Sequence, residues 1–291
     1  MNVGIVTRNP NSYSSSMLME AMRKRSIPHL AFAFPRLVAR VNRLPNFSVG
    51  KTQEMNLDAL IVRPIGRGSL EQTVFRLDTL YRLQRSGVSV INSPEAIEHC
   101  VDKYDVVALL EEHGLPVPET VATESVAGGL RAFDDLGRDV VVKPLFGSRG
   151  IGATRINDKE TASVVFRTIV FNHGVLYIQR YVPHGTSDIR AFVIGDRVAA
   201  SMRRVASGWK ANYSQGARPR SITLDKTLED MAVEAARSVE CQIGGVDIVE
   251  SPAGPFLVEV NSQPGWKGLQ SVSTINIADE IVAFVLSELK K

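Results

Sequence analysis

Short apolar runs alternate with amphipathic segments over the first hundred residues, and this alternation limits the fold more than any other feature of the chain. Residues 2–6 (NVGIV), 57–63 (LDALIVR) and 88–92 (VSVIN) are typical of buried strands. The segments 15–25 and 71–87 carry apolar residues three and four positions apart, which is typical of helices. Strand–helix alternation predicts a parallel, doubly wound sheet. No GxGxxG follows the first strand, so dinucleotide binding has no support.

The pattern changes from VVVKPL (140–145) onward, where short strand-like runs are separated by Gly and Asp turns. The runs 176–182 (LYIQRYV) and 188–205 (DIRAFVIGDRVAASMRRV) belong to this pattern, which is typical of an antiparallel-rich α+β region. Between the two regions, the segment 92–103 (NSPEAIEHCVDK) begins a helix and marks a domain boundary. We therefore expect an α/β (α+β) chain of two or three compact units, which suits its 291 residues.

Composition and charge exclude several classes of protein. Apolar residues make up 44% and charged residues 22%, as in ordinary globular enzymes. Cys100 and Cys241 lie far apart and in no metal-ligand spacing, so we expect reduced thiols and no zinc site. The start MNVGIVTRNP lacks the features of a signal peptide, and no apolar run approaches a membrane span, so we expect a cytoplasmic protein. A net charge of +3 is too mild to predict nucleic-acid binding.

One stretch, residues 197–220, carries six basic residues and no acidic one. A solvated basic face is the ordinary interpretation of such a run. The alternative is an anion-binding loop, which the neighbouring motifs favour.

A lysine and a glycine-rich loop form the first motif with chemical meaning. Lys143 ends an apolar strand, and glycines in the loop behind it allow backbone N–H groups to close on a phosphate. The spacing is not that of a P-loop, because no Gly-Lys-Ser/Thr follows. A plain Gly-rich hairpin with an exposed lysine is the alternative. The loop consists of Gly147, Ser148, Arg149, Gly150, Ile151 and Gly152.

A predicted hairpin over residues 244–265 carries the second motif. If the hairpin is symmetric about Ala253, Asp247 and Glu259 face each other across the two strands. Asn261, two residues beyond Glu259, points to the same face. Clustered carboxylate and amide oxygens suit Mg²⁺. A solvent-facing charged hairpin is the alternative, and the apolar neighbours of both carboxylates weaken it.

The order of these motifs resembles the ATP-grasp superfamily, and specifically its RimK-like amino-acid ligases. The resemblance covers nearly the whole chain and includes IVRPIG in the first region. It is most specific in residues 188–204, in WKANYSQG (209–216) and in EVNSQPGWKGL (259–269). Residues 258–281 are most similar to the members that add glutamate to tetrahydromethanopterin. The implied fold has a small parallel-sheet domain (1–98), a central lid-like subdomain (99–183) and a C-terminal subdomain (184–291), with ATP between the last two.

The resemblance also implies roles for individual residues. ATP phosphates are expected on Lys103 and Lys143 beneath the glycine loop, and Mg²⁺, or Mn²⁺ in its place, on the Asp247, Glu259 and Asn261 side chains. Family members often have an acidic residue at the adenine hinge, where this chain has Gln179 and Arg180, which puts that side-chain contact in doubt. The adenine pocket is expected to comprise Gln179, Arg180, Tyr181 and Val182, with Asp188 also binding nucleotide, and the acyl-phosphate site to comprise Arg190, Arg204 and Asn212.

The function that the resemblance implies is ATP-dependent ligation of L-glutamate, through an acyl phosphate, to a carboxylate-bearing acceptor. The expected acceptor is a small anionic one-carbon coenzyme of the tetrahydromethanopterin or methylofuran type. Two alternatives stay open. A ligase acting on a protein tail or an amino-group carrier protein would differ in the first domain and around residues 209–215. A non-catalytic ATP-binding module would have lost a lysine or a metal ligand. A homo-oligomer is one expectation for the assembly, which the sequence does not specify.

Overall fold

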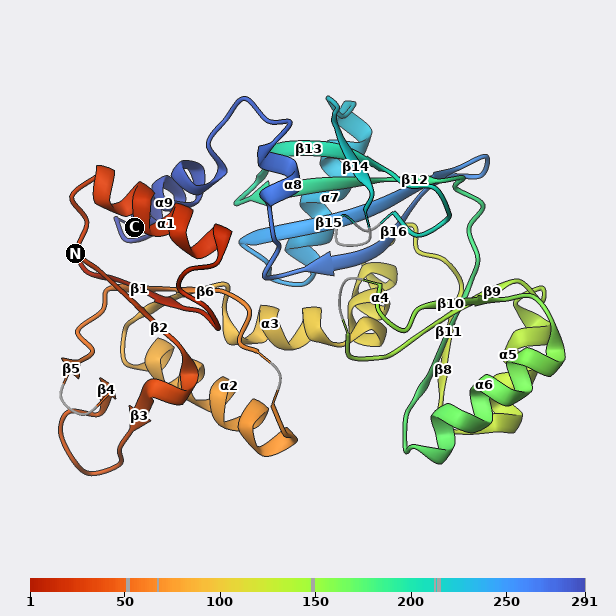
Figure 1. The fold of residues 1–291 in the computed structure, drawn as a ribbon, viewed down its shortest axis with the longest axis horizontal. Coiled ribbons are helices and arrows are strands. Elements are labelled where there is room, and N and C mark those ends of the chain that lie inside the picture. The colour runs from red at the N-terminus through yellow and green to blue at the C-terminus, as the bar shows by residue number, and fades with distance from the viewer. Residues whose placement is uncertain (51–52, 67, 148–149, 212, 214–215, 291) are drawn as a thin grey trace.

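The computed structural model describes residues 1–50, 53–66, 68–147, 150–211, 213 and 216–290. The chain forms an elongated molecule, with a parallel sheet at one end, a small antiparallel sheet at the other and a larger antiparallel sheet between them (Figure 1). The fold class predicted from the sequence is therefore confirmed. Within the described ranges, no helix combines the length and apolar character that crossing a membrane requires.

The N-terminal sheet is wholly parallel and has the strand order β2-β1-β6-β7. Helices α1 and α9 pack on one face of it, while α2 and a short antiparallel sheet pack on the other. The predicted doubly wound arrangement is thus present, although the short sheet was not expected. The elements are β1 (Val3–Val6), α1 (Tyr13–Lys24), β2 (His29–Phe32), the 3-10 turn η1 (Phe34–Arg36), β3 (Leu37–Ala39), β4 (Phe47–Val49), β5 (Gln53–Glu54), β6 (Ala59–Val62), α2 (Leu70–Arg85), β7 (Ser89–Ile91) and α9 (Ile277–Glu288).

The small antiparallel sheet at the opposite end has the order β10-β9-β11-β8, and two helices cover one of its faces (Figure 1). Its strands β9 and β10 are joined by the glycine-rich loop, as predicted for a loop between two strands. The elements are β8 (Thr120–Thr123), α5 (Val126–Asp135), β9 (Val140–Lys143), β10 (Thr154–Ile156), α6 (Lys159–Phe171) and β11 (Leu176–Arg180).

The large antiparallel sheet has the order β14-β13-β12-β15-β16. Helix α7 packs against it together with α3 and α4, and their apolar side chains form one core cluster with β12, β15 and β16. The elements are α3 (Pro94–Val101), α4 (Lys103–Glu112), β12 (Ser187–Ile194), β13 (Arg197–Val205), β14 (Arg218–Ser221), α7 (Lys226–Ser238), β15 (Ile243–Ser251), β16 (Gly254–Asn261) and α8 (Lys267–Gln270).

Two capped helices fix the path of the chain between the parallel sheet and the site. Ser93 caps α3 by accepting a hydrogen bond from the Ala96 N–H, and Pro94 occupies the first helical position, where its missing N–H costs nothing. Asp102 caps α4 in the same way, accepting from the Tyr104 N–H at 2.8 Å. The second cap makes Lys103 the first residue of α4, which places its side chain beside the glycine loop.

Candidate functional site

A cavity lies between the small and the large antiparallel sheets, and most of the residues predicted for nucleotide binding line it. Residues from α4, β9, the glycine loop and the end of β11 form one side, and residues from β15 and β16 form the other. Predicted residues in the cavity wall are Lys103, Lys143, Gly147, Gly150, Ile151, Gln179, Arg180, Tyr181, Val182, Asp188, Asp247 and Glu259.

Lys143 is held in the cavity wall by a side-chain network that involves β11 and β8. Its Nζ donates to Gln179 Oε1 at 2.8 Å, and Gln179 Nε2 donates to the Thr120 hydroxyl at 3.0 Å. Burial lowers the pKa of Lys143 to about 8, against the opposing effect of the Glu259 carboxylate. Gln179, at the position where the family often has an acidic residue, therefore orients a lysine in this chain.

Lys103 ties the start of α4 to the glycine loop. Its Nζ donates to the backbone carbonyls of Leu145 at 3.3 Å and Gly147 at 2.8 Å. Burial lowers the pKa of Lys103, while Glu259 and Asp102 work in the opposite direction. The two lysines thus approach the loop and the carboxylates from different elements, which gives the cavity a cationic wall facing an anionic one.

The glycine loop needs glycine at particular positions. Gly150 and Gly152 have φ angles of +67° and +81°, in the left-handed region that residues other than glycine rarely adopt. A Cβ on Gly152 would also lie 2.7 Å from Cγ of Pro144. The loop can therefore adopt its path over the cavity only with glycine at position 152. Two of its predicted residues, Ser148 and Arg149, lie outside the described residues.

Asp247 and Glu259 face each other across β15 and β16, as the sequence predicted. The turn is centred half a residue earlier than expected, since Ser251 pairs with Gly254. A register shift between Asp247 and Ile248 compensates for this offset and brings the two carboxylates opposite each other. Asn261 lies opposite Gly245 in the same hairpin. Its Oδ1 accepts a hydrogen bond from the Gln263 N–H at 2.9 Å.

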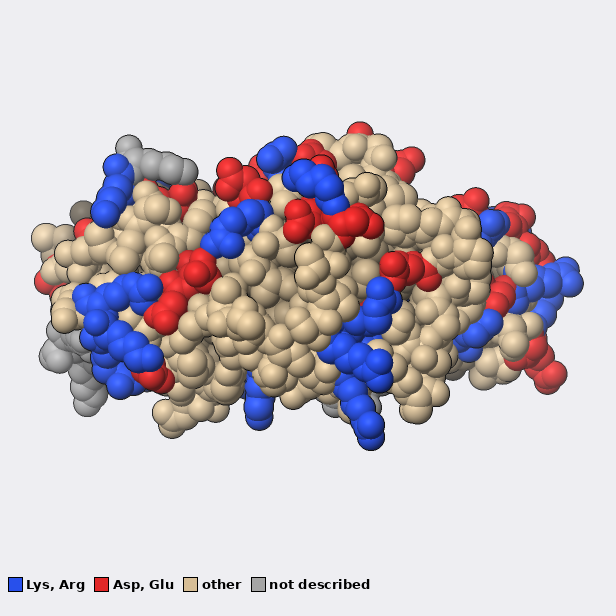
Figure 2. Space-filling model, turned by 90° about the horizontal axis from the view of Figure 1, so that it is seen from above, with Lys and Arg blue, Asp and Glu red and all other residues tan. Residues whose placement is uncertain are grey.

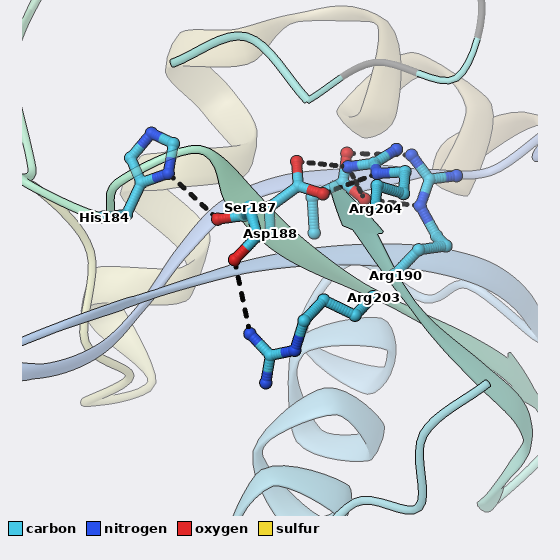
Figure 3. Close-up of polar contacts among 7 residues, drawn as sticks. His184, Ser187, Asp188, Arg190, Arg203 and Arg204 are labelled. Carbon is cyan, nitrogen blue, oxygen red and sulfur yellow. Dashed lines mark hydrogen bonds and ion pairs between the residues drawn. The ribbon is translucent and has the colours of Figure 1, made fainter. Parts of the chain in front are cut away.

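Two arginines and two aspartates form a buried charge cluster behind the carboxylate wall (Figure 3). Arg190 donates to both oxygens of Asp247, with Nη2 at 2.8 Å from Oδ2. Arg204 donates to both oxygens of Asp188 at 2.6 Å, and its Nη2 also lies 3.0 Å from Asp247 Oδ1. All four residues are less than a tenth exposed. Burial works to raise the pKa of Asp247, but the two arginines outweigh it and hold that pKa below its ordinary value.

The donor set fits Mg²⁺ that is also bound by phosphates. Glu259 forms no hydrogen bond or ion pair with another described residue, so its oxygens are available. Asp247 is ionised, and Mg²⁺ commonly takes one or two carboxylates together with substrate phosphates and water. Among the described residues, no group of three or more His, Cys, Asp or Glu side chains could hold a metal by itself. The site therefore suits a metal that arrives with a nucleotide.

The residues predicted to bind adenine lie at the end of β11 and in the segment that follows it. The Arg180 and Tyr181 N–H groups donate to the backbone carbonyls of Glu119 at 2.8 Å and Asp139 at 2.9 Å. The Tyr181 ring lies beneath the Arg155 guanidinium, 3.5 Å from its centroid to Arg155 Cζ. These contacts fix the segment against the small sheet and leave its cavity side free for a ligand.

Three of the six basic residues in the stretch 197–220 pair with acids from elsewhere in the chain. Arg197 pairs with Glu280 and Arg203 with Glu250, while Arg204 belongs to the buried cluster. On the face drawn in Figure 2, basic side chains gather in two separate places, at the left end and below the middle, and acidic side chains lie beside them. The stretch is therefore a poorer anion attractor than its sequence indicated.

Some cavity residues were not identified as site residues from the sequence. Trp209 and Lys210 line the cavity, and the Trp209 ring packs edge-on against Tyr181 at 6.2 Å between centroids. Both belong to the WKANYSQG segment, so a signal was present without a role for either side chain. Asn212 of the same segment, predicted for the acyl-phosphate site, lies outside the described residues.

Comparisons with known proteins agree with this geometry. Residues 100–285 match the RimK-like ATP-grasp domain. The tetrahydromethanopterin:alpha-L-glutamate ligase of Methanosarcina acetivorans is 33% identical over 97% of this chain and 98% of its own length. The enzyme of the same name from Methanococcus maripaludis is 31% identical over the full length of both chains.

Solved structures show the same fold. The ATP-grasp ligase PsnB, complexed with minimal precursor, Mg and ADP, has a TM-score of 0.77 at 20% identity and covers 100% of this chain and 98% of its own. D-cycloserine synthetase DcsG has a TM-score of 0.74 at 18% identity, covering 99% of this chain and 100% of its own. Both the family match and the full-length relatives confirm the resemblance carried by the motifs. The chain therefore belongs to the RimK-like ATP-grasp family and is an ATP-dependent amino-acid ligase.

Proposed function

We propose that this ligase joins L-glutamate to the carboxylate of a small anionic acceptor, through an acyl phosphate formed from ATP. The observation that carries the proposal is the cavity in which Lys103 and Lys143 face Asp247 and Glu259. A wall of two cations opposite a wall of two carboxylates suits a nucleotide triphosphate accompanied by a divalent cation. The full-length similarity to two tetrahydromethanopterin:alpha-L-glutamate ligases supports glutamate as the amine substrate.

In the proposed reaction, the acceptor carboxylate attacks the γ-phosphorus of ATP and releases ADP. Lys143 and Lys103 offset the negative charge of the phosphates during the transfer. The amine of glutamate then attacks the acyl carbon, and phosphate leaves as the amide forms. Arg190 and Arg204 are fixed by Asp247 and Asp188, so their charges are already oriented toward the oxyanion of the second step.

Asp247, Glu259 and Asn261 would hold Mg²⁺, which when bound supplies charge stabilisation on the transferring phosphate. Glu259 is the ligand with no competing partner among the described side chains. The glycine loop would close over the phosphates and keep water from the acyl phosphate. Val182, which lines the cavity just beyond the hydrogen-bonded Tyr181 N–H, would present its backbone to adenine.

The acceptor we propose is a one-carbon coenzyme of the tetrahydromethanopterin or methylofuran type. The support is the full-length similarity to ligases named for tetrahydromethanopterin. Since acids neutralise Arg197, Arg203 and Arg204, the basic stretch contributes less to this choice than its sequence indicated.

The test is ADP release by the purified enzyme with ATP, L-glutamate and a panel of pterin, furan and peptide acceptors. We expect weak turnover with ATP alone and a strong rise only when glutamate and an acceptor are both present, because the site protects its intermediate. Mass spectrometry of the acceptor should show the added glutamyl residue. Equal ADP release with and without acceptor would exclude a ligase reaction, and glutamylation of a peptide alone would exclude the coenzyme assignment.

A further inference from the structure

Arg63 lies at the carboxyl end of β6, where the strand order of the parallel sheet reverses. In the order β2-β1-β6-β7, the chain leaves β1 toward β2 and later returns to its other side as β6. The crevice outside the carboxyl ends of strands at such a reversal is where open α/β sheets bind ligands. The Arg63 N–H extends the sheet by donating to the Val6 carbonyl at 2.9 Å. Side chains alternate along a strand, so Arg63 shares the face of Ala59 and Ile61, which is the face that Trp266 covers.

The Arg63 guanidinium is buried without a counter-ion. It is 5% exposed, and it pairs with no Asp or Glu in the part of the chain that the structure describes. Its Nη2 donates to the Pro264 carbonyl at 2.9 Å, and its Cζ lies 4.7 Å from the centroid of the Trp266 ring. Burial lowers the pKa of Arg63 to about 10, so it stays charged at neutral pH. An unpaired buried charge is costly to a fold, which points to an anion supplied by a ligand.

Three buried side-chain donors, one on Arg63 and two in the turn from Gln263 to Trp266, lack an acceptor among the described residues: Arg63 Nε, Gln263 Nε2 and Trp266 Nε1. All three belong to Arg63 or to the turn that it contacts at Pro264 and Trp266. Each is an N–H donor, and a carboxylate offers two oxygens that accept hydrogen bonds from such groups. The chemistry that completes this arrangement is therefore a carboxylate.

The same turn also touches the charge cluster of the active site. A Cβ placed on Gly245 would lie 2.8 Å from Pro264 Cβ and 2.6 Å from Arg190 Nη1, so Pro264 and Arg190 are close neighbours. The end of β16 and the end of β6 approach each other in Figure 1 at this place. A ligand held by Arg63 would consequently extend toward Arg190 and the reacting groups.

We propose that Arg63, Gln263 and Trp266 form a subsite for a non-reacting carboxylate of a substrate, belonging either to L-glutamate or to the acceptor. This inference rests on the proposed ligase reaction, because both substrates of that reaction carry such a group. The free space beside Arg63 and Trp266 is only about 10 Å³, so the turn from Gln263 to Trp266 moves outward when the carboxylate enters. Trp266 is one of two tryptophans in the chain and reports that movement.

The experiment is a titration of the enzyme with Mg²⁺ and a non-hydrolysable ATP analogue already bound, followed by calorimetry and tryptophan fluorescence. The probes are L-glutamate, glutamine, the α-amide of glutamate, and tetrahydromethanopterin. The variants are Arg63→Met, Trp266→Phe and, as a matched control, Arg237→Met, which removes an exposed arginine of α7 that pairs with Glu234. We expect Arg63→Met to weaken one carboxylate probe by about 10- to 100-fold and Trp266→Phe by a few-fold, with Arg237→Met like the wild type.

The two amides identify which carboxylate of L-glutamate Arg63 recognises. The amide that lacks the recognised carboxylate should bind the wild type as weakly as L-glutamate binds Arg63→Met. If Arg63→Met loses affinity for tetrahydromethanopterin alone, the carboxylate held by Arg63 belongs to the acceptor. Unchanged affinity of every probe for folded Arg63→Met would overturn the subsite. An equal loss of affinity for the ATP analogue and the probes would also overturn it, since a purely structural role of Arg63 predicts that result.

The Trp266→Phe variant keeps the inference testable if Arg63→Met does not fold, because it removes the indole N–H donor and keeps a smaller aromatic ring in the core. Full affinity of Trp266→Phe for every probe would then count against the subsite. The failure of the proposed function looks different. If the wild type forms no glutamyl product but binds a carboxylate in an Arg63-dependent way, the subsite stands and the substrate assignment falls.

Discussion

Arg190 and Asp247 are directly opposite residues on β12 and β15, and the guanidinium donates hydrogen bonds to both oxygens of the carboxylate. The carboxylate predicted to bind metal is therefore neutralised by the protein itself in this structure. A divalent cation that binds Asp247 has to share it with Arg190 and Arg204. In the proposed site, the arginines would consequently limit how strongly Asp247 binds the metal before the nucleotide arrives.

This pairing predicts the behaviour of Arg190→Met. Removing one partner of a buried ion pair costs about 3–5 kcal/mol, and since Arg204 still contacts Asp247 we expect a loss of stability of about 2–3 kcal/mol. Mg²⁺ should raise the melting temperature of the variant more than that of the wild type, because Asp247 is freer to bind it. Thermal denaturation with and without Mg²⁺ measures both effects. Arg197→Met, which breaks the exposed pair with Glu280, is the control and should keep the wild-type response.

Glu259→Gln tests the anionic face of the cavity. The substitution keeps the shape of the side chain and removes the charge that faces both lysines, so ligation should fall at least about 100-fold while the fold persists. Glu250→Gln, on the same hairpin but paired with Arg203, is the control and should stay active. Initial rates over a range of Mg²⁺ concentrations provide the measurement. Near-normal rates in Glu259→Gln would remove Glu259 from the metal site.

The affinity for ATP should depend on pH through Lys143. Its pKa is lowered to about 8, and only the protonated form attracts phosphate. Affinity should therefore be constant well below pH 8 and should fall by about tenfold for each pH unit above it. Calorimetric titration with an ATP analogue between pH 6.5 and 9.5, values chosen to bracket that pKa at roughly 1.5 units on each side, measures this dependence. Lys143→Met should bind weakly throughout with no step near pH 8, and a step that persists would belong to another group.

Gly152→Ala tests the path of the glycine loop. The φ angle of +81° and the 2.7 Å approach to Pro144 Cγ both oppose a Cβ at this position. We expect a strain of about 1–2 kcal/mol, which the loop relieves by shifting away from the cavity and so weakens ATP binding roughly 5- to 30-fold. Gly208→Ala, where a Cβ meets open space, is the control. Equal affinities of both variants would mean that the loop does not hold the nucleotide.

The parts of the site that could be predicted were those specified by short stretches of sequence. The opposition of Asp247 and Glu259 followed from the alternation of side chains along one hairpin, although a register shift beside Asp247 was needed to produce it. The cluster of Arg190, Arg204 and Asp188 with Asp247 could not be predicted from spacing. It depends on the registers of three strands that come together only in the folded sheet.

Two helices of the small sheet were also missed, for a related reason. Helix α5 contains Gly128 and Gly129, and α6 is rich in β-branched and aromatic residues, so both have low intrinsic helix propensity. They form because Phe133 and Phe166 pack into the core of the small sheet. A Cβ on Gly129 would lie 2.6 Å from Leu176 Cδ1, so the glycine that weakens the helix allows its close contact with the sheet.

Helix α9 completes the core of the parallel sheet from the far end of the chain. Its residues Ile281, Val282 and Val285 pack in one cluster with Val3 and Ile5 of β1. Helix α1 covers part of this face, so the face is fully covered only after α9, which follows both antiparallel sheets in the sequence, has been synthesised. Native folding of the parallel sheet therefore has to wait for α9, and a nascent chain that stalls before α9 exposes apolar surface that chaperones recognise.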